Sequence, residues 1–247
     1  MEGHIQLAAE KIAHIGPLAI TNTLLTTWIV TGILLLFAYF ATRKQSKIPQ
    51  GLQNIAEMII EGLEGVVEPI AGNKTKVFMP ILVSFFLFIL LGNYFGLLPG
   101  VGTLGFYEMH EGREVFVPFL RSINSDLNTT LALGIVSIVY THYLAIKYLG
   151  FAGYIGKFLS LNPIFLFVGI LELFGEFTKV VSLSFRLFGN VFAGEVLLTT
   201  ASTKLFAYLV PIPFYSLELL VGFVQAFIFT MLTCTFMVIL TEKHEAH

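Results

Sequence analysis

The stretch SLSFRLFGN, residues 182–190, places Arg186 in the middle of a long apolar segment, residues 161–205. A helix of that length would measure roughly 65 Å at 1.5 Å per residue, about twice the hydrocarbon core of a bilayer. Pro163 stands at the start of the segment and no other proline interrupts it. The segment therefore predicts one long, strongly tilted helix that carries a permanently charged side chain.

The rest of the chain belongs to the same class of protein. Of its 247 residues 56% are apolar and only 12% are charged, about half the charge of an ordinary soluble domain. Four further apolar runs are each long enough to cross a bilayer: 20–41, 77–98, 127–149 and 212–240. We therefore expect an all-α polytopic membrane protein, a single membrane domain over 1–247 with five membrane-embedded helices. The long penultimate helix should pack against the last.

Residues 51–70 differ from the apolar runs. Four glutamates recur there at helical spacing, opposite a stripe of aliphatic residues: Glu57, Glu61, Glu64 and Glu68. This pattern predicts an amphipathic helix that is too polar to span the membrane and lies at its interface. Because the polar face is acidic, a protein partner is as plausible as lipid headgroups.

Basic residues indicate the orientation of the chain. By the positive-inside rule, the cluster that follows the first run faces the cytoplasm. Residues 1–19 then lie outside and the C-terminus inside, and the first run is retained, since no basic n-region of a signal peptide precedes it. Eight basic residues fall inside and four outside under this topology: Arg43, Lys44, Lys47, Lys74, Lys76, Lys147, Lys157 and Lys243, against Lys11, Arg113, Arg121 and Lys204.

Several classes of function are excluded or disfavoured by composition. With one cysteine, Cys234, the chain cannot form an internal disulfide or a cysteine zinc site. It contains no HExxH or GxSxG motif, no basic block for nucleic acid and no sign of a cofactor or metal site. His142, between two tyrosines, is interpreted as a packing histidine, and His244 and His247 as part of a solvated tail.

Arg186 belongs to a face of small residues. At 100° per residue, four small residues fall within about 20° of one line, and Arg186 lies about 40° from it. A second backbone could approach closely along this face, whose members are Gly175, Ser182, Gly189 and Ala193. Polar residues lie beside it, between about 60° and 120°: Glu172, Glu176, Lys179 and Asn190.

The acidic residues fall on both sides of the arginine. Glu172 lies about 21 Å before Arg186 along the helix axis and Glu195 about 13 Å after it. An antiparallel last helix would bring Glu218 towards Glu195, and Gln225 towards Arg186. Carboxylates in such positions can hand protons on, whereas arginine keeps its proton and acts as a fixed charge.

Each of these residues also has a structural interpretation. Arg186 could form a structural salt bridge with Glu172, Glu176 or a neighbouring helix. Glu176 and Lys179 are interpreted as a local i, i+3 ion pair. Asp126 and Asn128 could line an external entrance, but an Asp before an apolar run is also an ordinary N-cap. The self-contained alternative, an ion channel or secondary transporter, would need a closed path within one chain, and no internal repeat is visible.

SLSFRLFGNVFAGE (182–195), followed by GFVQAFIFTMLT (222–233), closely resembles subunit a of F-type ATP synthases. Supporting matches are ITNTLLTTWIV (20–30), NYFGLLPG (93–100) and NSDLNTTLALG (124–134), so the resemblance covers nearly the whole chain. In that family the arginine faces the essential carboxylate of a rotating ring of c subunits, between two offset half-channels. The resemblance implies that Arg186 is this arginine.

The resemblance also assigns roles to neighbouring residues. Asn190, Glu195 and Gln225 match polar family positions, and Glu172 matches an acidic position on the cytoplasmic side. Ser182, one turn before Arg186, is a further candidate for proton translocation. Glu218 stands where many bacterial members have histidine, and it and Glu195 could share a proton. The implied partners are the c-ring, the peripheral-stalk b subunits, the F1 sector and the lipid bilayer. The implied location is a bacterial inner membrane, and the subunit would be a proton-translocating stator without catalytic chemistry of its own.

Overall fold

The computed structural model describes residues 9–15, 18–98, 100–101, 104–110, 113–158, 163–204 and 211–242. The described chain is mostly helical. Its α-helices are α1 (Asn22–Thr42), α2 (Leu52–Ala71), α3 (Thr75–Gly96), α4 (Leu127–Phe158), α5 (Pro163–Lys204) and α6 (Pro211–Thr241). Two short 3-10 helices, η1 (Gly72–Lys74) and η2 (Ile123–Ser125), lie next to α3 and α4.

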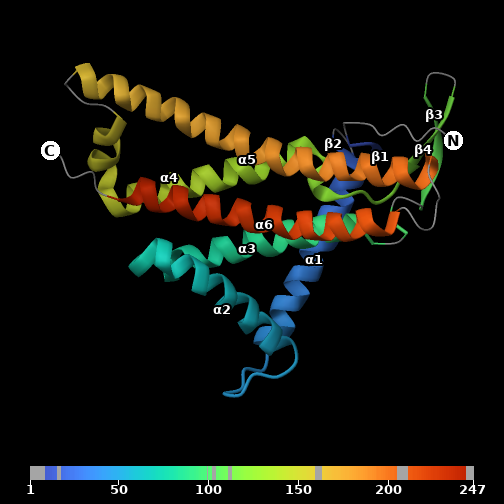
Figure 1. The fold of residues 1–247 in the computed structure, drawn as a ribbon, viewed down its shortest axis with the longest axis horizontal. Helices are drawn as coiled ribbons and strands as arrows, with labels where there is room; N and C mark the ends of the chain where they lie inside the picture. The colour runs from blue at the N-terminus through green and yellow to red at the C-terminus, as the bar shows by residue number, and fades with distance from the viewer. Residues whose placement is uncertain are drawn as a thin grey trace.

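Four long helices run side by side and form the body of the molecule (Figure 1). α3, α4, α5 and α6 are closely aligned, with α6 in contact with the other three. The end of α5 and the start of α6 lie at one end of this body, together with η2 and the strands. The start of α5 and the end of α6 lie at the other end. Residues early and late in α5 are therefore presented at opposite ends of the bundle.

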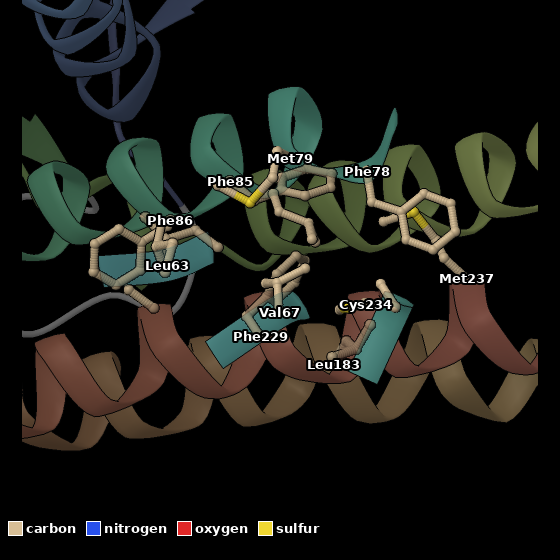
Figure 2. Packing of buried hydrophobic residues seen from close by; sticks show 14 of the residues in the cluster. Leu63, Val67, Phe78, Met79, Phe85, Phe86, Leu183, Phe229, Cys234 and Met237 are labelled. Carbon is tan, nitrogen blue, oxygen red and sulfur yellow. The ribbon is translucent and has the colours of Figure 1, made fainter. Parts of the chain in front are cut away.

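The apolar core lies where α3 meets α6, with contributions from α2 and α5. Phe85 of α3 and Phe229 of α6 form an edge-to-face pair with ring centroids 5.4 Å apart. Figure 2 shows Leu63 and Val67 of α2 in the same cluster. This packing fixes the position of α6 along the axis of α3. It therefore also fixes the positions of the polar residues of α6.

α1 and α2 lie outside the four-helix body and, with α3, outline a triangle (Figure 1). α2 buries Leu63, Val67 and Ala71 on one side, whereas Glu61 and Glu68 are exposed. Gly72, at φ 53°, ends α2 and lets the chain turn into α3.

Within the described residues, four stretches are long and apolar enough to cross a membrane: Asn22–Thr42, Leu52–Gly96, Leu127–Phe158 and Ile212–Thr241. The second stretch combines α2 with α3. The protein is therefore a mostly helical, multi-pass membrane protein. α5 is a continuous helix of 42 residues, as the apolar run around Arg186 predicts.

Three features lie outside the helical pattern that the sequence predicts. Two antiparallel hairpins form before α1 and between α3 and α4: β1 (Lys11–Ile15) with β2 (Leu18–Thr21), and β3 (Gly105–His110) with β4 (Arg113–Pro118). α4 extends to Phe158 but is kinked at Gly150, whose φ of 73° is a left-handed conformation. The kink turns the last part of α4 across the end of the body (Figure 1).

Candidate functional site

Arg186 lies in a groove on the surface of the body. The groove has a volume of about 340 Å³ and is formed by α5 and α6. Its lining is Gly175, Thr178, Lys179, Ser182, Leu183, Arg186, Leu232 and Phe236. The Arg186 side chain is exposed and donates a hydrogen bond of 3.4 Å to the Ser182 hydroxyl. Two residues that the sequence singles out are thus brought together here, one helical turn apart.

The small-residue face of α5 is open to the outside. A Cβ atom added at Gly175 or at Gly189 would meet no other atom within 4 Å. Ser182, Gly189, Asn190 and Ala193 are also exposed. Small residues on an interior face normally admit a neighbouring helix of the same chain, but here the space that they leave is unfilled by the described residues.

The carboxylates of α5 have basic neighbours other than Arg186. Glu172 Oε1 lies 3.9 Å from Lys157 Nζ of α4, and Glu176 Oε1 accepts a 2.6 Å hydrogen bond from Lys179. The latter is the expected i, i+3 ion pair. Among the described residues, no carboxylate lies within 4 Å of Arg186. The internal salt bridge considered for Arg186 is therefore not formed.

A second polar group surrounds Glu195, towards the end of α5. Arg121, which is only 6% exposed, places Nε 3.2 Å from Glu195 Oε1. Glu218 of α6 is 8% exposed, and its carboxylate fills the space that a Cβ at Gly194 would need. Only glycine at position 194 allows this approach, which brings Glu218 next to the residue that precedes Glu195. Gln225, further along α6, is also buried.

Amide and hydroxyl groups continue this polar region between η2 and the helices. Asn93 donates to the backbone oxygen of Gly222 at 2.9 Å, and Asn124 donates to Asn93 Oδ1 at 2.7 Å. Asp126 accepts hydrogen bonds from the Thr23 hydroxyl at 3.1 Å and from the backbone and side-chain amides of Asn128. Asp126 thus caps α4 while joining it to α1.

A third polar group lies near the start of α5. His142 of α4 places Nε2 3.8 Å from Glu176 Oε2 and Nδ1 3.1 Å from the Tyr154 hydroxyl. Lys179 Nζ lies 4.8 Å from the centroid of the Phe236 ring, a cation–π contact. The interpretation of His142 as a packing histidine does not anticipate these polar neighbours, Glu176 and Tyr154.

Sequence reasoning missed the partners that come from distant segments. Arg121 is 74 residues from Glu195, and Asn124 is 31 residues from Asn93. Helical periodicity relates only residues within one helix, so no pattern joins these pairs. The one available signal is the polar run NSDLN at 124–128, which stands directly before an apolar helix.

Comparisons with known proteins find similar sequences over nearly the whole chain. A family model described as ATP synthase A chain matches residues 24–238. ATP synthase subunit a of Moorella thermoacetica is 34% identical over 234 residues, which cover 95% of this chain and 97% of that protein. Subunit a 2 of a Bradyrhizobium species is 34% identical over 93% of each chain. Subunit a of Gloeobacter violaceus is 35% identical over 95% of this chain and 89% of its own.

Proposed function

The chain belongs to the ATP synthase A chain family, the proton-translocating stator subunits of the Fo sector, and we propose how its residues perform that function. In this proposal, the groove around Arg186 receives the ion-binding carboxylate of each c subunit as the ring rotates past α5. The subunit itself carries no catalytic chemistry.

The observation that carries this proposal is the state of Arg186. It is an exposed guanidinium without a carboxylate within 4 Å among the described residues, although three glutamates share its helix and have basic neighbours. A cation held within a membrane protein needs a counter-charge. The open face formed by Gly175, Ser182 and Gly189 leaves room for a partner helix that brings one.

Two polar pathways would then meet at Arg186 from opposite ends of the bundle. The inner pathway begins at Glu172, and the outer pathway includes Glu195, Glu218, Gln225 and Asn190. Asp126 and Asn128 stand near its external entrance. Because arginine does not release its proton, Arg186 would block direct flow between the pathways and force protons onto the ring.

Further assignments follow from the same proposal. α5 would be the fifth membrane helix, α2 would lie at the membrane interface, and the N-terminus would face outwards with the C-terminus in the cytoplasm. The complex would be placed in a bacterial inner membrane, with peripheral-stalk b subunits and the F1 sector as further partners. A self-contained transporter would have no use for the open face beside Arg186.

Cross-linking within the assembled complex tests the ring contact. In a Cys234→Ser background, Ser182→Cys labelled with a thiol-reactive benzophenone should cross-link to a c subunit on illumination, because Ser182 lies on the small-residue face. Phe177→Cys is the matched control: Phe177 is 71% exposed but lies about 140° away around α5. Equal labelling of c by both variants, or labelling from Phe177→Cys alone, would contradict the proposed interface.

A further inference from the structure

The cluster of His142, Tyr154, Glu176 and Lys179, here called the inner cluster, is left unused by the function proposed above. It exists because α4 changes direction at Gly150, which brings Tyr154 back to His142, twelve residues earlier. α5 supplies Glu176 and Lys179 from the facing side. The four side chains thus come from three separate helical segments.

Glu176 is the buried centre of the inner cluster. Its side chain is only 5% exposed. One oxygen, Oε1, is bonded to Lys179, whereas Oε2 is buried without a hydrogen-bond partner among the described residues. A buried carboxylate oxygen without a hydrogen bond is costly. His142 Nε2 lies 3.8 Å from this oxygen, so a protonated imidazole at this position would place a positive charge opposite it.

Tyr154 makes His142 able to hold either charge state. A tyrosine hydroxyl can donate or accept a hydrogen bond. It can donate to Nδ1 when the ring is neutral with its proton on Nε2, and it can accept from Nδ1–H when the ring is charged. Histidine is also the side chain that ordinarily changes its charge between about pH 5 and pH 8. We propose that His142 and Glu176 form a proton-binding pair that loads the inner pathway of this stator.

The position of the pair connects it to both ends of that pathway. Lys179, which holds Glu176, also lines the groove of Arg186. Towards the inner end, Lys157 contacts Glu172 and donates a 2.9 Å hydrogen bond to the backbone oxygen of Ile239. The charged groups that face His142 come from α5, while α6 presents the Phe236 ring beneath Lys179.

The proposed step moves a proton and no other atom. A proton from water on the inner side bonds to Nδ1 of His142, which carries no proton in the neutral ring, while the Tyr154 hydroxyl turns to accept a hydrogen bond from Nδ1–H. The Glu176 carboxylate stabilises the resulting imidazolium. The imidazolium then releases this proton from Nδ1 to water and returns to its neutral form, and the proton passes by way of the groove to the ring carboxylate near Arg186. The inference rests on the proposed function, because only a subunit that passes protons to a ring needs such a pair.

ATP-driven acidification of inverted vesicles that carry the whole complex tests the pair, since pumping then draws protons from the medium through the inner pathway. His142→Gln keeps hydrogen-bonding capacity towards Tyr154 and Glu176 but cannot exchange a proton. We expect its pumping to fall about tenfold relative to native at about pH 8, where free protons are scarce, and to be near native at about pH 6. Glu176→Gln should show the same pH-dependent loss.

Tyr143→Phe is the matched control, because Tyr143 is next to His142 and 58% exposed. Its pumping should follow the native pH profile, and pumping is compared per unit of membrane-bound ATPase. A native pH profile of pumping in both glutamine variants would overturn the proposal. A loss of pumping that does not depend on pH, or failure of both variants to assemble, would also overturn it, because either result indicates that the inner cluster is structural. Pumping by Arg186→Ala would contradict the proposed stator function itself. If Arg186→Ala loses pumping but both glutamine variants pump like the native complex, only the proposal about His142 and Glu176 is contradicted.

Discussion

At the scale of single residues, the molecule separates two kinds of charge. Glu172, Glu176 and Glu195 have cations within 4 Å, whereas within the described parts of the chain the Arg186 side chain has only the hydroxyl of Ser182 as a polar partner. In an ion pair each charge is compensated by the other, whereas an exposed guanidinium without a carboxylate nearby remains available to a partner. The difference between the paired carboxylates and the unpaired arginine of α5 therefore lies in their neighbours within the described residues and not in residue type.

The pair between Arg121 and Glu195 provides a residue-scale prediction. Arg121→Gln should destabilise the subunit by about 1.5–3 kcal/mol, because it removes a charge-assisted hydrogen bond at a position only 6% exposed. The loss is measured as a lower unfolding temperature of the purified complex. The double variant Arg121→Gln with Glu195→Gln should recover part of it, since no unpaired charge remains. Additive losses in the double variant would show that the two side chains are not coupled.

Residue spacing predicts only some of these relations. The stripe of Gly175, Ser182 and Gly189, and the pair of Glu176 with Lys179, follow from the turn of one helix and could be predicted from the sequence. The ion pair of Arg121 with Glu195 could not, because it joins a loop to a helix 74 residues later. The contact of His142 with Tyr154 depends on the positive φ of Gly150, a backbone state that the apolar pattern does not contain.

At the scale of elements, α5 uses its glycines and small residues on two different faces. Gly134 of α4 brings that helix close to α5, since an added Cβ would lie 2.5 Å from Ser184 Oγ and 3.2 Å from the backbone oxygen of Val180. Gly189, by contrast, has open space beside it. One face is therefore filled by α4, whereas the other is open within the described residues and is the face proposed for a partner.

Substitution of Gly134 should affect folding. Gly134→Ala forces α4 away from α5, and overpacking of this kind costs about 1–3 kcal/mol. The expected result is less assembled subunit and a lower unfolding temperature of the complex. Unchanged stability would mean that α4 and α5 do not approach each other as closely as the structure has them.

Substitution of Gly189 should affect function instead. A Cβ atom added at Gly189 meets no described atom within 4 Å, so we expect the Gly189→Leu subunit to retain its stability, but the leucine would occupy the space proposed for the c-ring. ATP-driven pumping should be lost while subunit a remains in the membrane. Gly65→Leu is a suitable control, because Gly65 lies on α2 and also has no neighbour within 4 Å of an added Cβ. Normal pumping by the Gly189 variant would exclude a close partner at this face.

At the scale of the whole molecule, the apolar runs predict the helical membrane class, and the family comparison confirms the identity of the subunit. The hairpin of β3 and β4 could not be predicted in this way, because its strands are short and lie among mixed charges. Along α5, Glu176 and Glu195 lie on either side of Arg186 in sequence, and the two ends of this helix lie at opposite ends of the bundle (Figure 1). The proposed function uses this arrangement for two offset pathways to a rotating partner.

ATP-driven acidification of inverted vesicles that carry the complex with Arg186→Ala tests this account most directly. The account predicts that acidification vanishes while subunit a and membrane-bound ATPase activity are retained, because the ring carboxylate loses its fixed counter-charge. Thr178→Ser, a conservative change in the lining of the same groove, should pump normally. Acidification by the Arg186→Ala complex at the native rate would show that the arginine is structural and that protons take another path.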